Sequence, residues 1–336
     1  MKLVHSINSV DTHAEGCPIR ILTGGIPLLK GSTMLEKMLF MQKNYDWIRT
    51  LTMCEPRGHR QMVGAVLTEP ISKEAHIGVF YIDSGWYAPM CGAGTIALSK
   101  ALIEIGIVPI KEPVTTVIMD TPSGIVKAYA NVKNGLVESV SFENVASFVY
   151  QKNNRTTIDE IGTVSYDICY GGNFFVFIKD SCIGFKVEPE NSEILTHYGM
   201  KILKKINTEI EVRHPENHDI HFLNDIMITG ETQIENGKKI YKNTVIFGGS
   251  QMDRSPCGTG TCARMALLYS CGELCVNEEF IHESIIGSRF TGKILKVDKR
   301  EGYEYITCQV SGQTHITGFN NLVVDYDDRL KAGFLL

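Results

Sequence analysis

The chain has 336 residues, 43% of them apolar and 21% charged, and a formal net charge of −5. This composition is typical of a folded globular protein with room for two domains, and it includes no dense basic cluster of the kind that binds nucleic acid. No apolar run approaches the ~18 residues of a membrane span, and the N-terminus lacks an apolar signal sequence. We therefore expect a cytoplasmic protein that binds neither nucleic acid nor a membrane.

Strand-forming segments dominate the chain. They are rich in β-branched and aromatic residues and are bounded by Gly, Asn, Asp or Pro. In chain order, the predicted strands are residues 20–25, 76–83, 114–120, 138–145, 173–180, 243–249, 293–298 and 303–310.

Helical patterns are fewer and are of two kinds. Residues 33–53 and 191–210 are amphipathic, with apolar residues at helical spacing. Two shorter helices are predicted to begin after Cys91 and Cys257, and both are apolar on most faces. Because such a helix must be enclosed by other structure, the pattern predicts two strand-rich halves, each surrounding one central helix.

The two short helices are preceded by the same loop. Cys-Gly-X-Gly-Thr stands at residues 91–95 and again at residues 257–261, 166 positions later (257 − 91). The glycines allow tight turns and close approach of a ligand, and the N–H groups of a helix start attract an anion. A phosphate-binding P-loop would continue with Gly-Lys-Ser/Thr, which is absent here, so a carboxylate is the better ligand.

Each loop also places a cysteine at a helix start, where the thiolate is favoured and the thiol pKa is expected to fall. Two sulfur atoms that face one small acid from opposite sides could invert a stereocentre bearing a C–H bond, because one removes the proton while the other supplies one. We therefore predict that Cys91 and Cys257 are catalytic. The sequence has no Walker A, Rossmann or metal-ligand motif, so we expect no cofactor and no metal.

Other interpretations of the cysteines and histidines remain open. A cysteine at a helix start can be purely structural, and a disulfide between Cys91 and Cys257 would be an oxidised, inactive form in a reducing cytoplasm. His214, His218 and His221 include the i, i+4 spacing of metal ligands, but Pro215 argues against a continuous helix there.

Several longer motifs resemble those of one known family. They are residues 11–25, 55–59, 90–96, 170–175, 253–266 and 316–325, and the string Asp-Arg-Ser-Pro-Cys-Gly-Thr-Gly-Thr at 253–261 is the most specific. The chain resembles the proline racemase family, which includes hydroxyproline 2-epimerases and 3-hydroxyproline dehydratases.

The resemblance implies a mixed α/β (α+β) fold of the diaminopimelate epimerase-like type. Two pseudo-symmetric domains would each form a curved, mostly antiparallel sheet around a central helix, with the active site between them. We place the first domain at residues 1–128 together with a returning C-terminal tail at 312–336, and the second at 129–311.

The resemblance also assigns roles to individual residues. Cys91 and Cys257 would be the paired acid and base, and Asp253 would accept a hydrogen bond from the substrate's ring ammonium. The amides expected to hold the substrate carboxylate are those of Gly92, Ala93, Gly258 and Thr259. Apart from the resemblance, Glu55, Arg57 and His59 are expected to form a buried ion-pair corner that supports the first loop rather than to act directly as catalysts.

Two pocket residues bear on the substrate. Phe247 resembles the aromatic wall that proline racemases place against the bare ring, whereas Val63 is smaller than the phenylalanine usual in those enzymes and leaves room for a ring hydroxyl. The space at Val63 favours 4-hydroxyproline over proline. The family usually has Glu and His where this chain has Cys17 and Ala93, and these departures bear on the substrate without favouring either ring. We thus expect a cofactor-independent 2-epimerase that converts trans-4-hydroxy-L-proline to cis-4-hydroxy-D-proline.

The alternatives to this function are three. They are a proline racemase, a 3-hydroxyproline dehydratase, and a protein that binds imino acids without turning them over. Cys91 argues against the dehydratase, because family members of that type tend to have Ser or Thr at this position. The expected partner is a small-molecule substrate, proline or hydroxyproline, and a homodimer remains open.

Overall fold

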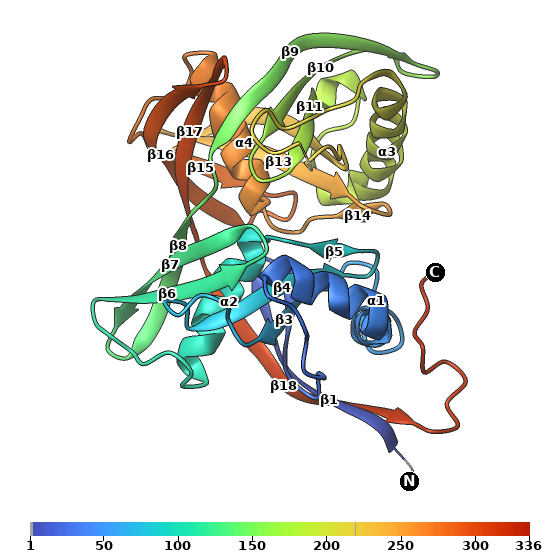
Figure 1. The fold of residues 1–336 in the computed structure, drawn as a ribbon. Helices are drawn as coiled ribbons and strands as arrows, with labels where there is room; N and C mark the ends of the chain where they lie inside the picture. The colour runs from blue at the N-terminus through green and yellow to red at the C-terminus, as the bar shows by residue number, and fades with distance from the viewer. Residues whose placement is uncertain (1–2, 219) are drawn as a thin grey trace. The chain divides into compact units, whose positions relative to one another are not determined.

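The structure is a computed structural model that describes residues 3–218 and 220–336. Contacts within the chain divide it into two units. Unit 1 comprises described residues 3–142 together with Gly312–Leu336, and unit 2 is Glu143–Ser311. Both units are mixed α+β with mostly strands, as the sequence predicted (Figure 1).

Unit 1 is built on a mostly antiparallel sheet. Its strands are β1 (Leu3–Ala14), β2 (Cys17–Gly24), β3 (Val63–Thr68), β4 (Ile77–Asp83), β5 (Tyr87–Ala88), β6 (Val114–Thr121), β7 (Gly124–Lys133), β8 (Leu136–Glu143) and β18 (Thr314–Asp325). Strand β1 pairs antiparallel with β2 and β18, β2 runs parallel to β3, and β3 pairs antiparallel with β4. Strand β4 pairs antiparallel with β5 and parallel with β6, and β6, β7 and β8 continue antiparallel.

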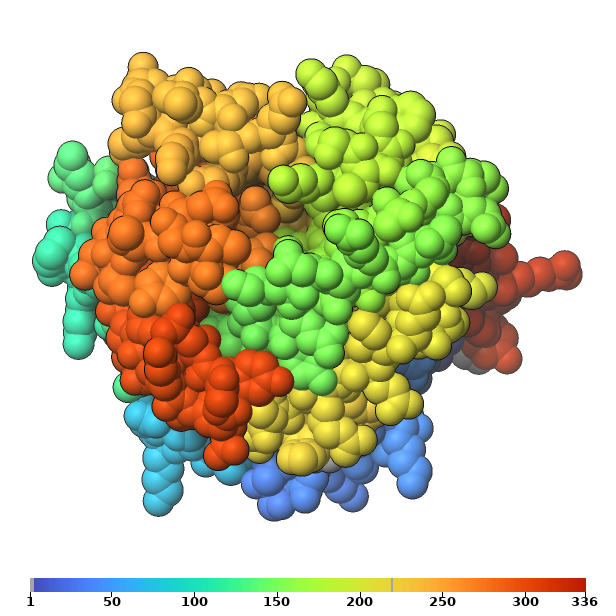
Figure 2. Space-filling view, turned by 90° about the horizontal axis from the view of Figure 1, so that it is seen from above, coloured from blue at the N-terminus to red at the C-terminus, as the bar shows by residue number. Residues whose placement is uncertain are grey.

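Unit 2 has a sheet of the same kind. Its strands are β9 (Ser147–Ile158), β10 (Gly162–Tyr170), β11 (Phe174–Lys179), β12 (Asp225–Glu235), β13 (Lys238–Phe247), β14 (Gln251–Met252), β15 (Phe280–Glu283), β16 (Arg289–Arg300) and β17 (Tyr303–Gly312). Strands β9, β10 and β11 are antiparallel, β11 runs parallel to β12, and β12 pairs antiparallel with β13. Strand β13 pairs antiparallel with β14 and parallel with β15, and β15, β16 and β17 continue antiparallel. Figure 2 shows the face on which the green β9 segment lies beside the orange-red β16–β17 hairpin, with which it pairs.

The two units repeat one connectivity. In unit 1, helix α1 (Met34–Met53) joins the parallel strands β2 and β3, and α2 (Gly92–Glu104) follows β5. In unit 2, α3 (Ser192–Glu209) joins β11 and β12, and α4 (Gly258–Ser270) follows β14. Even the outer strands correspond, because β18 pairs with β1 as β9 pairs with β10. The predicted pair of pseudo-symmetric domains is confirmed.

The four helices differ in burial as the sequence patterns predicted. Helix α3 buries five residues at helical spacing, from Leu195 to Ile206, and is half-buried or exposed elsewhere, whereas α2 buries every residue from Gly92 to Ser99. Helix α4 is enclosed in the same way, and Figure 1 shows it among the strands of unit 2, with α3 outside them. Gly106 and Gly272 take φ of 78° and 73° directly beyond α2 and α4, which only glycine adopts at low cost, and end these helices.

The division of the chain differs from the predicted boundaries at one point. The first crossover lies between residues 142 and 143, 14 residues beyond the predicted position (142 − 128). The reason is that β7 and β8 form a hairpin that continues the sheet of unit 1 from β6. The return to unit 1 at Gly312 leads into β18.

Candidate active site

The loop of unit 1 places Cys91 at the N-cap of α2. Its Sγ accepts a hydrogen bond from the N–H of Gly94 at 3.3 Å, and its carbonyl accepts the N–H of Thr95 at 2.8 Å. The backbone of Cys91 is extended, with φ −145° and ψ 119°. Gly92 and Ala93 occupy the first helical positions, where helix geometry leaves backbone N–H groups without an acceptor inside the helix.

The loop of unit 2 repeats this arrangement at Cys257. Its Sγ accepts from the N–H of Gly260 at 3.4 Å, and Gly258 and Thr259 open α4. One feature differs: Cys257 has φ 69° and ψ 115°. A residue with a Cβ rarely takes such a conformation, which costs about 1–3 kcal/mol and persists only where the surrounding structure holds it.

The fourth residue of each loop is glycine, at a point where the helix start packs directly on a buried strand. A Cβ at Gly94 would lie 2.4 Å from Cε1 of Tyr81 on β4, and one at Gly260 would lie 2.7 Å from Cε of Met227 on β12. The second glycine of the Cys-Gly-X-Gly-Thr pattern therefore has a packing reason in both loops.

The pKa of Cys257 departs from the sequence expectation. Burial raises the pKa of this thiol well above its usual value, and the carboxylates of Asp253 and Asp225 act in the same direction. The hydrogen bond from Gly260 lowers the pKa but does not outweigh these effects. The prediction that the helix start lowers the thiol pKa is thus wrong for Cys257, which rests as a neutral thiol able to donate a proton.

Asp253 is linked to this cysteine through Ser255. It is 8% exposed, and its Oδ1 accepts the backbone N–H of Ser255 at 2.8 Å and the hydroxyl of Ser255 at 2.9 Å. The hydroxyl oxygen of Ser255 accepts the N–H of Cys257 at 3.2 Å, so Ser255 links the carboxylate to the cysteine backbone. Burial raises the pKa of Asp253 from 3.8 to about 6.

Phe247 and Val63, the two predicted pocket residues, belong to unit 2 and unit 1, respectively. Phe247 ends β13, is half-buried, and packs with Cys257 against an apolar cluster that includes Met227 and Val245. Val63 begins β3, is 8% exposed, and has its Cα opposite that of Asp83 on β4.

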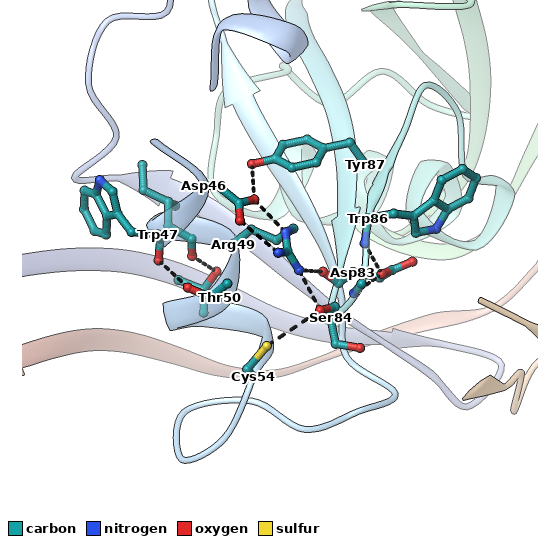
Figure 3. A network of polar contacts seen from close by, with 12 residues as sticks. Asp46, Trp47, Arg49, Thr50, Cys54, Asp83, Ser84, Trp86 and Tyr87 are labelled. Atoms are coloured by element: carbon teal, nitrogen blue, oxygen red, sulfur yellow. Dashed lines mark hydrogen bonds and ion pairs between the residues drawn. The ribbon is translucent and has the colours of Figure 1, made fainter. Parts of the chain in front are cut away.

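A polar network holds the turn that leads into the Cys91 loop, and the sequence analysis missed it (Figure 3). Arg49 donates to the carboxylate of Asp46 at 2.8 Å and to the carbonyl of Ser84 at 2.6 Å, while the hydroxyl of Tyr87 donates to Asp46 at 3.0 Å. Arg49 lowers the pKa of Asp46, so the ion pair is favoured. The Asp-X-X-Arg spacing within helix 33–53 was the available signal, but an i, i+3 pair does not reveal that its cation reaches a distant turn.

The corner expected from Glu55, Arg57 and His59 is built with the C-terminal tail. Arg57 forms an ion pair with Asp328 at 3.1 Å, and its Nε donates to the carbonyl of Val323 at 3.0 Å. The backbone of Glu55 pairs with that of Phe334.

His214, the first of the three histidines in residues 214–221, has a structural role. Nδ1 of His214 accepts the N–H groups of Glu216 and Asn217 at 3.2 and 3.1 Å, and its ring packs edge-on against Phe148 and Tyr170. Among residues 3–218 and 220–336, no three His, Cys, Asp or Glu side chains are grouped to hold a metal ion. Over the same described residues, no helix combines the length and apolar character needed to cross a membrane.

This fold of two units with one connectivity, each built around an enclosed helix, is shared with solved isomerases of the racemase and epimerase class. A solved structure of this class is the hydroxyproline epimerase of Agrobacterium vitis with bound trans-4-hydroxy-L-proline, which is 27% identical, covers 100% of this chain and 96% of its own, and superposes with a TM-score of 0.91.

The proline racemase family model matches residues 9–335, and the chain belongs to this family. It is 43% identical over 336 residues to a proline racemase of Clostridioides difficile, with 100% of both chains covered. It is also 38% identical over 336 residues to a trans-3-hydroxy-L-proline dehydratase of Bacillus thuringiensis, again with 100% of both covered.

Proposed function

We propose that the chain inverts the configuration at C2 of a proline-type amino acid, without a cofactor, using Cys91 and Cys257 as its acid and base. The observation that carries this proposal is the presence of two cysteines at matching N-caps of two enclosed helices. In one direction Cys91, as thiolate, takes the C2 proton, and Cys257, as thiol, gives its proton to the opposite face of C2. In the other direction the roles exchange.

The backbone around the cysteines supports the proposed chemistry. The N–H groups at the starts of α2 and α4, including those of Gly92, Ala93, Gly258 and Thr259, would bind the substrate carboxylate and stabilise the negative charge that grows as the C2–H bond breaks. Ala93 departs from the family pattern in its side chain, but it supplies a backbone amide all the same. Asp253 would accept a hydrogen bond from the ring ammonium. The reaction needs both thiols reduced, which suits the cytoplasmic location expected from the sequence.

We propose proline as the preferred substrate, with trans-4-hydroxy-L-proline as the second candidate. Full-length similarity to a proline racemase supports proline, as does Phe247, a half-buried aromatic ring that packs on the same apolar cluster as Cys257 and suits an unsubstituted pyrrolidine. Val63 supports the second candidate, because a valine leaves more space than the phenylalanine usual in proline racemases. This order reverses the preference drawn from the sequence alone.

The test of the reaction is hydrogen exchange in deuterated water. Purified protein with reduced thiols should incorporate deuterium at C2 of proline and yield both enantiomers, as seen by proton NMR and chiral chromatography. Release of water from trans-3-hydroxy-L-proline, with a trappable cyclic imine, would instead identify a dehydratase. Calorimetric binding of proline without exchange would identify a binding protein, and either result would overturn the proposal.

The substrate assignment has its own prediction. Val63→Phe should lower kcat/KM for trans-4-hydroxy-L-proline about tenfold or more relative to proline, because overfilling a packed pocket costs ~1–3 kcal/mol where a hydroxyl must fit. Val63→Ala is the matched control, since it enlarges the same position and should not penalise the hydroxylated ring. Equal effects of Val63→Phe on both substrates would show that this residue does not discriminate between them.

A further inference from the structure

A buried hydroxyl in the first turn of α4 is hydrogen-bonded to the Cys257 loop. Thr261 is 0% exposed, and its Oγ1 donates to the carbonyl oxygen of Cys257 at 2.6 Å. The backbone N–H of Thr261 donates to the same oxygen at 2.8 Å. One residue thus holds the carbonyl of the cysteine through two donors.

Thr261 is in turn bound to a buried histidine. His282, on β15, is 0% exposed, and its Nδ1 lies 2.9 Å from Oγ1 of Thr261. Its Nε2 lies 2.6 Å from Nδ2 of Asn243, on β13. The second hydrogen of Nδ2 of Asn243 is shared between the carbonyl oxygens of Pro256 at 3.4 Å and Glu283 at 3.5 Å, and these two acceptors identify the atom as the amide nitrogen.

These contacts determine the protonation of His282. The hydroxyl of Thr261 gives its one proton to a carbonyl, so it must accept from Nδ1–H of the imidazole. Nδ2 of Asn243 can only donate, so Nε2 must accept. His282 is therefore neutral, which agrees with burial that lowers its pKa well below the usual value and with the nearby charge of Arg264, which acts in the same direction.

We propose that His282 is a positioning residue for Cys257 and acts through Thr261 and Asn243. Asn243 donates a hydrogen bond to the carbonyl of Pro256, which precedes Cys257, and Thr261 donates to the carbonyl of Cys257 itself. His282 is hydrogen-bonded to both of these side chains. Cys257 needs this support because its φ of 69° is unfavourable for a residue with a Cβ. The inference rests on the proposed function, in which the placement of this thiol matters.

Unit 1 provides an internal comparison. Thr95 stands at the position that corresponds to Thr261, but its hydroxyl pairs with that of Tyr81 at 3.0 Å. Cys91 has an ordinary extended backbone, so no strained conformation has to be held there. The contacts of His282 with Thr261 and Asn243 are thus found in the unit whose cysteine has the strained backbone.

The test compares Thr261→Val, which removes the hydroxyl at nearly constant volume, with Thr261→Ser, which keeps it. His282→Phe removes both ring contacts. The rates at which iodoacetamide alkylates Cys257 and Cys91 are measured in the full chain, as a function of pH, by peptide mass spectrometry. Thr261→Val and His282→Phe should raise the Cys257 rate at least about fivefold relative to Cys91, because a relaxed loop exposes the thiol to solvent and its pKa falls. Thr261→Ser should stay within about twofold of the parent protein.

His214→Gln is the control for effects that come from loss of stability alone, because it alters a second buried histidine of unit 2. If Thr261→Val and His282→Phe lower Tm as this control does but leave the alkylation of Cys257 and its pH profile unchanged, the positioning role is wrong. Alkylation does not depend on turnover. A chain that exchanges no C2 hydrogen would overturn the proposed function, and the alkylation rates would still decide the role of His282.

Discussion

Replacing either Cys91 or Cys257 by serine should lower the rate of C2 inversion by about a thousandfold, within the range that general acid–base groups contribute. A serine hydroxyl is far less acidic than a thiol, so it can neither hold the negative charge of the base nor return a proton readily. Because each face of C2 needs its own group, one remaining cysteine cannot compensate. Enantiomer interconversion followed by chiral chromatography measures the loss.

Isotope exchange makes this prediction more specific. A variant that keeps one cysteine should still exchange the C2 hydrogen of the enantiomer facing that sulfur, without inverting it, and the two single variants should prefer opposite enantiomers. Cys271→Ser and Cys275→Ser are suitable controls, since both cysteines are exposed, and they should retain full activity. Inversion at the parent rate by either Cys91→Ser or Cys257→Ser would refute the two-cysteine mechanism.

Asp253→Asn should lower kcat/KM about 10- to 100-fold, because a hydrogen bond to a charged partner contributes ~1.5–3 kcal/mol. The same change should stabilise the protein at neutral pH. Burial raises the pKa of Asp253 from 3.8 to about 6. Above pH 6 the folded chain therefore holds a buried carboxylate, whose charge would be better solvated in the unfolded chain. The difference corresponds to about 3 kcal/mol at most, from about 1.4 kcal/mol per pH unit.

The pH dependence tests the sign of this effect. As the pH falls below 6, the folded parent protein takes up a proton at Asp253 before the unfolded chain does, so the stability gap between parent and variant should shrink. In the same range, kcat/KM of the parent should fall, since a neutral Asp253 no longer attracts the ammonium. Thermal melts and kcat/KM profiles across this range measure both quantities.

Asp120→Asn is the contrasting control. Asp120 is a buried carboxylate of unit 1 whose Oδ2 accepts the N–H groups of Ile71 and Ser72 at 2.8 and 2.7 Å. Its replacement should cost stability and leave kcat/KM unchanged. A variant of Asp253 that loses stability but keeps kcat/KM would assign that residue the same structural role.

Local sequence patterns were sufficient to predict much of this fold. Helix 33–53 was expected from its periodicity, and the structure has α1 at Met34–Met53 with Thr33 as N-cap. The two enclosed helices were also expected, because an apolar surface on most faces is a property of a short segment.

Properties that depend on distant segments were not accessible in this way. The raised pKa of Cys257 arises from burial and from carboxylates that include Asp225, 32 residues away (257 − 225). The hydrogen bonds of Arg49 with Ser84 and of His282 with Thr261 likewise join segments that are far apart in the sequence, so a short stretch of sequence does not reveal them. The position of a cysteine at a helix start was readable from the sequence, but the electrostatic surroundings of that cysteine were not.

The pairing of β18 with β1 has a consequence for synthesis on the ribosome. Unit 2 is one uninterrupted stretch of chain, so all of its residues are synthesised before the last strand of unit 1. The partner of β1 is residues 314–325, which follow unit 2 in the chain. Unit 2 can therefore begin to fold first, while β1 keeps an unpaired strand edge until residues 314–325 have left the ribosome, and that edge is where the nascent chain needs protection from aggregation.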